Sequence, residues 1–76
     1  MFSLDDLKEI IKARFKMDLS AVSDNETLEA IGFDSLSQLD LAQAIKKKYG
    51  IRITDNDMES ISTLKDIVLF VSGKLS

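Results

Sequence analysis

One short motif carries residue types suited to covalent chemistry, Phe33-Asp34-Ser35-Leu36. A loop-like stretch gives way there to a helical pattern, so Ser35 is predicted at a helix start. Free backbone amides and the positive end of the helix dipole favour a phosphodiester at such a position. Asp34 can help to hold the metal ion that accompanies a phosphate donor, and Leu36 offers an apolar contact beside a modified serine. The alternative is an ordinary helix cap, because Asp-Ser is common where helices begin.

The composition excludes several other kinds of chemistry. The chain has neither cysteine nor histidine, so a thiolate metal site and Ser-His or Cys-His nucleophile pairs are excluded, and we expect no metal site. A net charge of −3 argues against nucleic-acid binding, which needs a basic face. No apolar run reaches the roughly 18–20 residues that span a bilayer, so membrane insertion is not expected.

The length and the start of the chain favour a simple organisation. Its 76 residues are too few for two cores, so residues 1–76 are expected to form one domain. The first residues lack the positive region of a secretory signal, which makes the cytoplasm the default location.

The spacing of apolar residues predicts an all-α protein, a small bundle of three long helices and one short one. The long helices are expected at 3–17, at 35–49 and from 63 along a stripe that ends at Leu75; the short one runs from 54 to about 60. A Ser or Thr followed three residues later by Asp, as in a capping box, stands at the first, third and fourth starts: Ser3 with Asp6, Thr54 with Asp57, and Thr63 with Asp66. Gly50 is expected to end the second helix.

The apolar positions also predict the core. The connection over 18–34 contains apolar residues at intervals, so it is expected to be pinned to the bundle rather than free. Ile51 and Ile53 are expected to be buried in an extended link. The core shared by the last three helices is predicted to contain Ile45, Ile53, Ile61, Val68 and Val71.

With these helices placed, the sequence resembles the acyl carrier protein family over nearly its whole length. Asp34-Ser35-Leu36 matches the attachment motif of that family, and Ile61-Ser62-Thr63-Leu64 matches its common Ile-Thr-Thr-Val segment. The resemblance implies a four-helix bundle and a 4′-phosphopantetheine arm, added to Ser35 from coenzyme A by a phosphopantetheinyl transferase. It also implies that acyl groups travel on this arm as thioesters between acyl-transferring or acyl-modifying enzymes, and a monomer suits such visits.

The second helix departs from the family pattern at its exposed positions. Members that serve fatty-acid synthesis usually have glutamates where this chain has Lys46-Lys47-Lys48, and often an apolar residue where it has Gln43. The lysines are either a solvated helix end or a surface that selects partners. We predict a partner surface made of Leu39, Gln43, Lys46 and Lys47, although Leu39 suits the core almost as well. The departures favour a specialised fatty-acid, lipid or polyketide pathway.

Several alternatives remain open at this point. Aminoacyl and peptidyl carrier proteins bear the same arm on the equivalent serine, so the chain could be one of these. A second alternative is a helical interaction module in which Ser35 is unmodified. An enzyme would have to work without His or Cys, so we expect no catalytic activity in the chain itself. Ala42 and Ala44 either allow close helix packing or leave room for an acyl chain.

Overall fold

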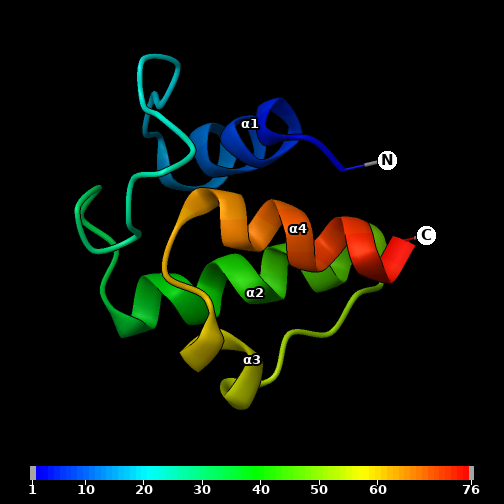
Figure 1. Ribbon diagram of the computed structural model, residues 1–76. Coiled ribbons are helices and arrows are strands. Elements are labelled where there is room, and N and C mark those ends of the chain that lie inside the picture. The colour runs from blue at the N-terminus through cyan, green and yellow to red at the C-terminus, as the bar shows by residue number, and fades with distance from the viewer. Residues whose placement is uncertain (1, 76) are drawn as a thin grey trace.

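The computed structural model describes residues 2–75, which form four helices: α1 (Leu4–Phe15), α2 (Ser35–Tyr49), α3 (Asp55–Ser60) and α4 (Leu64–Leu75). The three long helices lie side by side, and α3 lies below them after an extended link from α2 (Figure 1). Both ends of the described chain lie on the same side of the bundle. The all-α four-helix fold expected from the sequence is confirmed.

Three of the four helices are capped at their N-termini by reciprocal hydrogen bonds between a Ser or Thr and an Asp three residues later. At α1 the Asp6 amide donates to Ser3 Oγ at 3.2 Å, while the Ser3 amide donates to the Asp6 carboxylate at 3.0 Å. Each pair provides hydrogen-bond acceptors for two backbone amides that would otherwise have no partner at the start of a helix. The same arrangement occurs at α3 with Thr54 and Asp57, and at α4 with Thr63 and Asp66.

The helix boundaries agree with the sequence prediction to within one residue, except at the end of α1. Ser3 is the N-cap, as its capping pair with Asp6 predicted, but the helix expected to reach residue 17 stops at Phe15, so that end was wrong. Lys16 takes a left-handed conformation, with φ of 60°, and its amide donates to the Lys12 carbonyl at 3.0 Å. The end of α2 is as expected: Gly50 has φ of 73°, where a residue without a side chain is favoured.

The core lies between the three long helices and follows their apolar stripes. Of the predicted core residues, Ile45, Ile61 and Val71 are buried, but Ile53 and Val68 are only half-buried and pack against the core from its edge. Leu75 is 43% exposed, so its assignment to the buried stripe was wrong. It is the last residue of α4.

Phe2 is a core residue that the sequence patterns did not reveal. Its side chain is only 1% exposed, and its ring meets that of Tyr49 edge-on with centroids 5.1 Å apart. The Ser72 hydroxyl donates to the Phe2 carbonyl at 2.8 Å. Phe2 therefore ties the start of the chain to the ends of α2 and α4.

The long connection before α2 is pinned, as its apolar residues predicted. Leu28 is buried, and its amide donates to the Ser62 carbonyl at 2.9 Å beside an antiparallel bridge between Thr27 and Thr63. The Lys8 ammonium donates to the Val22 carbonyl at 2.7 Å. These contacts attach the connection to α1 and to the α3–α4 link, and so fix where the chain enters α2.

Candidate functional site

The sequence motif lies at the exposed start of α2. Ser35 is the first helical residue, and Asp34 is the N-cap, with extended backbone and an oxygen that accepts from the Ser37 amide at 2.8 Å. The Ser35 side chain is exposed, and Leu36 beside it is 77% exposed. The structure therefore brings the three predicted site residues together at one surface point.

The Asp34 carboxylate stays ionised next to this serine. The backbone amide of Ser37 is the largest cause that lowers the pKa of Asp34 below its usual value, and the amide of Leu36 adds a smaller contribution. Hydrogen bonds to the charged form stabilise that form. A full negative charge therefore stands one residue before the Ser35 hydroxyl at neutral pH.

The residues before the motif hold it in place. Phe33 is 3% exposed, its ring packs on Phe15 with centroids 4.8 Å apart, and its amide donates to the Leu28 carbonyl at 2.9 Å. Gly32 has φ of 94°, a left-handed conformation that favours glycine. The chain thus turns at Gly32 and buries Phe33 in the core. This anchor fixes the position of Ser35, which is exposed two residues later.

This geometry fits a phosphodiester-linked group on Ser35. The hydroxyl is exposed, so a modifying enzyme can reach it, and the helix start favours the negative charge of a phosphate. Leu36 supplies an apolar surface next to the attachment point. No side chain would have to leave the core to make room for such an arm.

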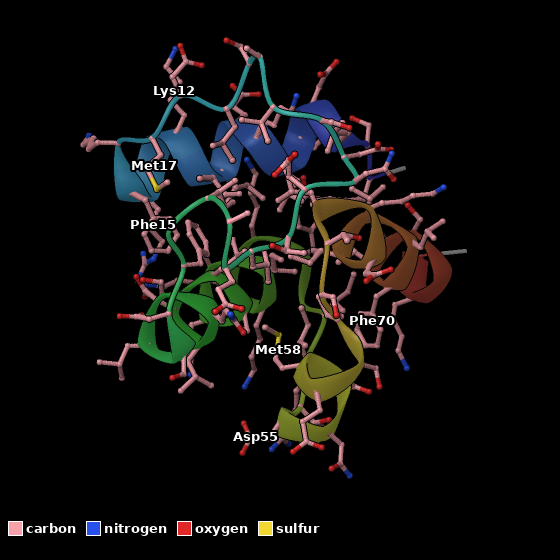
Figure 2. The ribbon with its side chains drawn as sticks, turned by 60° about the vertical axis from the view of Figure 1, so that its left-hand side comes forward. Lys12, Phe15, Met17, Asp55, Met58 and Phe70 are labelled. Atoms are coloured by element: carbon pink, nitrogen blue, oxygen red, sulfur yellow. The ribbon has the colours of Figure 1, made fainter. Side chains whose placement is uncertain are left out.

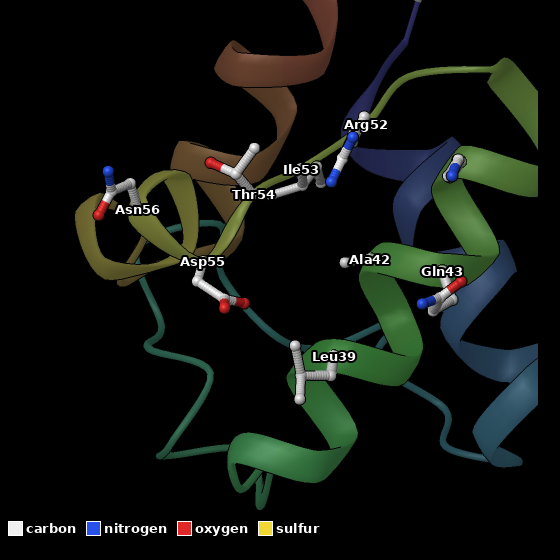
Figure 3. A pocket seen from close by; sticks show the side chains of 9 residues that line it. Leu39, Ala42, Gln43, Arg52, Ile53, Thr54, Asp55 and Asn56 are labelled. Carbon is white, nitrogen blue, oxygen red and sulfur yellow. The ribbon is translucent and has the colours of Figure 1, made fainter.

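The predicted partner residues lie along the exposed side of α2. Leu39 is 47% exposed, so the alternative that placed it in the core was wrong. Leu39, Gln43 and Lys46 line a hollow between α2 and the link to α3 (Figure 3). Lys47 lines a second hollow, which it shares with Gln43 and Lys46. The four residues therefore occupy one continuous surface, while their role stays a prediction.

Two residues of the first hollow were not proposed from the sequence. Arg52 and Asp55 come from the link and from the start of α3, and they face α2 across the hollow (Figure 3). The sequence did contain a signal for Arg52, which closes a run from 46 to 52 that holds four cations and no acid. Ala42 is 8% exposed in the floor of this hollow, and Ala44 packs against the core.

None of the helices within residues 2–75 is long and apolar enough to cross a membrane. Over the same residues, no three or more acidic side chains gather where they could hold a metal ion.

Comparison with known proteins defines the class of this chain. A family model described as a phosphopantetheine attachment site matches residues 5–71. An acyl carrier protein of Thermotoga maritima is 36% identical over 70 residues, which cover 91% of this chain and 86% of that protein. An acyl carrier protein of a Sulfurovum species is 32% identical over 74 residues, or 96% of this chain and 99% of the relative.

The solved structures agree with the sequence relatives. The crystal structure of an acyl carrier protein from Thermotoga maritima matches with a TM-score of 0.86 and 29% identity, covering 95% of this chain and 85% of that one. The molecule is thus a phosphopantetheine attachment domain. It belongs to the acyl carrier protein family, whose members carry a 4′-phosphopantetheine prosthetic group and are carriers rather than enzymes. The resemblance noted from the sequence is confirmed.

Proposed function

We propose that Ser35 is the attachment point of 4′-phosphopantetheine and that the chain carries acyl groups on this arm. The observation that supports the proposal most directly is the position of Ser35. It is an exposed serine that begins α2 behind a capping carboxylate, inside the range matched by the phosphopantetheine attachment model. When bound, the arm supplies a terminal thiol that forms thioesters with acyl groups.

Each residue of the motif has a distinct part in this function. The Ser35 hydroxyl oxygen forms the ester bond to the phosphate of the arm. The start of α2 stabilises the negative charge of that phosphate through its amides and dipole. Asp34 caps the helix and, being ionised, can bind the magnesium ion that a phosphopantetheinyl transferase brings with coenzyme A.

The outward position of Ser35 suits a carrier. Leu36 and Leu39 are exposed beside it, so a partner enzyme can contact apolar surface next to the arm while the core stays closed. The chain itself supplies the scaffold and no catalysis. In this proposal residues 1–76 act as one domain and as a monomer; the cytoplasmic location remains a prediction that cell fractionation tests.

The pathway is proposed to be a specialised fatty-acid, lipid or polyketide pathway. Support for this comes from the exposed Lys46, Lys47 and Lys48 at the end of α2. The mass of the cargo on material from the native host separates an acyl carrier from an aminoacyl or peptidyl carrier.

A mass measurement with two matched serine variants tests the attachment. The apo protein is incubated with coenzyme A, magnesium and a broad-specificity phosphopantetheinyl transferase, and the intact mass is recorded. We expect the wild type to gain one arm, Ser35→Ala to gain none, and Ser37→Ala, changed two residues further along α2, to gain one. Circular dichroism should show unchanged helix content in both variants. Full labelling of the Ser35→Ala variant would place the attachment elsewhere.

A further inference from the structure

The charges of this acidic chain are unevenly distributed. Its net charge is −3, yet the segment 46–52, which joins the last turn of α2 to the link, contains four cations and no acidic residue. All four cationic side chains, those of Lys46, Lys47, Lys48 and Arg52, are exposed. The electrostatic potential near this segment is therefore positive, although the molecule as a whole is negative.

None of these four cations takes part in an ion pair within residues 2–75. Lys48 lines neither of the two hollows beside α2, and its charge is a minor cause of the lowered pKa of Asp6 in α1. The one ion pair among residues 2–75 joins Arg14 to Asp40, with 2.5 Å between nitrogen and oxygen, so Asp40 in the second hollow is already paired with Arg14. Lys46, Lys47 and Arg52 line the two hollows beside α2, where Asp40 and Asp55 are the only acidic residues in the part of the chain that the structure describes, and we name these three cations the basic patch.

The basic patch continues an apolar surface that starts beside Ser35. Leu36, Leu39, Gln43 and Lys46 follow one another at intervals of three or four residues, so they lie along one side of α2. The distance along the helix from the first to the last is about 15 Å. The two leucines are 77% and 47% exposed. One side of α2 therefore runs from the exposed leucines next to Ser35, past the Gln43 amide, to the exposed cations of the basic patch.

Arg52 extends this surface across the first hollow. It lines the hollow together with Leu39, Gln43 and Lys46, although it comes from the link rather than from α2 (Figure 3). Asp55 lines the same hollow from the start of α3. Because Asp55 repels other carboxylates, an acidic surface that approaches the basic patch must sit over α2 and Arg52 rather than over α3.

We propose that Leu36, Leu39, Gln43, Lys46, Lys47 and Arg52 form a docking surface for enzymes that present carboxylates around an apolar entrance. The inference rests on the proposed function, since the arm on Ser35 has to enter the enzyme while this surface is in contact. The two leucines pack against the apolar entrance of the enzyme. The basic patch pairs with carboxylates of the enzyme that lie about 15 Å from this entrance, measured along α2. Complementary charges on the two surfaces accelerate association, whereas a partner with a basic rim is repelled by the basic patch.

Two engineered forms of a single enzyme provide the probe. A β-ketoacyl synthase is prepared with glutamates at four surface positions around its pantetheine entrance, and again with lysines at the same positions. The chain is loaded with an arm that ends in a cysteine-reactive group, and the rate of cross-linking to the active-site cysteine is measured at low and high salt. We expect the glutamate form to react at least tenfold faster at low salt, and high salt to reduce that advantage.

A matched pair of carrier variants assigns the effect to the basic patch. Lys46, Lys47 and Arg52 are changed to glutamate in one variant, and Lys12, Lys16 and Lys65 in the other; in both, three positive charges become three negative ones, so the net charge falls from −3 to −9. The first variant should reverse the preference between the two enzyme forms, and the second should keep it. If the first loses helical circular dichroism, a variant with glutamine at its three positions replaces it and should abolish the preference.

The outcomes separate this inference from the attachment itself. The intact masses of the wild type and of Ser35→Ala first show whether the arm is on Ser35; if it is not, the proposed function fails and this inference fails with it. If the arm is present and the wild type reacts equally with both enzyme forms, or faster with the lysine form, only the docking inference is overturned. The same holds if the Lys12, Lys16 and Lys65 variant reverses the preference as fully as the basic-patch variant.

Discussion

Helices α2 and α3 are neighbours in the chain but are stabilised in different ways. α2 has 15 residues and buries Leu41, Ala42 and Ile45 in the core. α3 has six residues and none of them is buried; Met58 points back toward the bundle and packs against its edge, while Asp55 lies at the outer end (Figure 2). Isolated helices this short are marginal in water. α2 therefore depends on the core, and α3 on local hydrogen bonds.

This difference separates a rigid part of the molecule from a part that can open. Ser35 is the first residue of the core-dependent helix, so the proposed attachment point is held by the global stability of the bundle. α3 and the link form one wall of the hollow beside the partner surface. Regions with few buried contacts open at lower free energy than the core does. We therefore expect α3 and the link to change conformation more readily than the start of α2, where Ser35 lies.

The largest predicted effect comes from breaking the core side of α2. Ile45 is fully buried, so Ile45→Ala should reduce the free energy of unfolding by about 2–5 kcal/mol. For a domain of this size that is a large fraction of the total. Met58→Ala on α3 should cost less than half as much, because Met58 is only half-buried. Urea denaturation measures both. A midpoint that hardly moves for Ile45→Ala would remove that residue from the core.

The second prediction uses acid to compare the same two helices. The amide and hydroxyl of Thr54 lower the pKa of Asp57 below 3.8. A carboxylate with a lowered pKa in the folded state stabilises that state fully above the unfolded pKa, and its contribution is lost as the pH falls through the folded value. Titration from pH 6 to pH 2, followed by Cα chemical shifts, should therefore unwind α3.

The Asp57→Asn variant is the control for this titration. Asparagine keeps an accepting oxygen but does not titrate, so α3 should be weaker at pH 6 and change less on acidification. Leu41 and Ile45 in α2 should report the opening of the bundle separately from that of α3. If α3 in the wild type and in Asp57→Asn respond to acid alike, the Asp57 charge does not stabilise this helix.

The smallest predicted effect is confined to α3. Thr54→Ala removes the hydroxyl that accepts from the Asp57 amide at 3.2 Å. Loss of such a cap costs about 0.5–2 kcal/mol, and here it should appear as faster amide exchange in α3, with the exchange of Ile45 in α2 unchanged. Thr63→Ala, the equivalent change at α4, should instead lower the urea midpoint, since α4 buries Leu64, Ile67 and Val71. Equal acceleration in α2 and α3 on Thr54→Ala would contradict the separation.

The parts of the fold that were predictable from the sequence are local. The capping pairs, such as Ser3 with Asp6, depend on a spacing of three residues, and the end of α2 depends on Gly50. The central core positions follow helical periodicity, which is why Ile45 and Val71 were placed correctly. Periodicity does not show how far a neighbouring element covers a helix, and so it overestimated the burial of Val68.

The remaining features depend on contacts between distant residues. Phe2 precedes the first helix, so no periodic pattern marks it, and it is buried by Tyr49 and by the end of α4. The pairing of Thr27 with Thr63 and that of Arg14 with Asp40 join residues far apart in the chain. Of the site, the motif around Ser35 was readable as sequence, whereas the position of Arg52 beside Lys46 requires the course of the link.

The most direct test of the central claim is tandem mass spectrometry of the chain purified from its native host. Fragment ions should locate the phosphopantetheine arm on Ser35, and mild hydroxylamine should release an acyl group from its thiol as expected for a thioester. An unmodified Ser35 with the arm on another residue, or a chain from actively growing cells that carries no arm at all, would contradict the account.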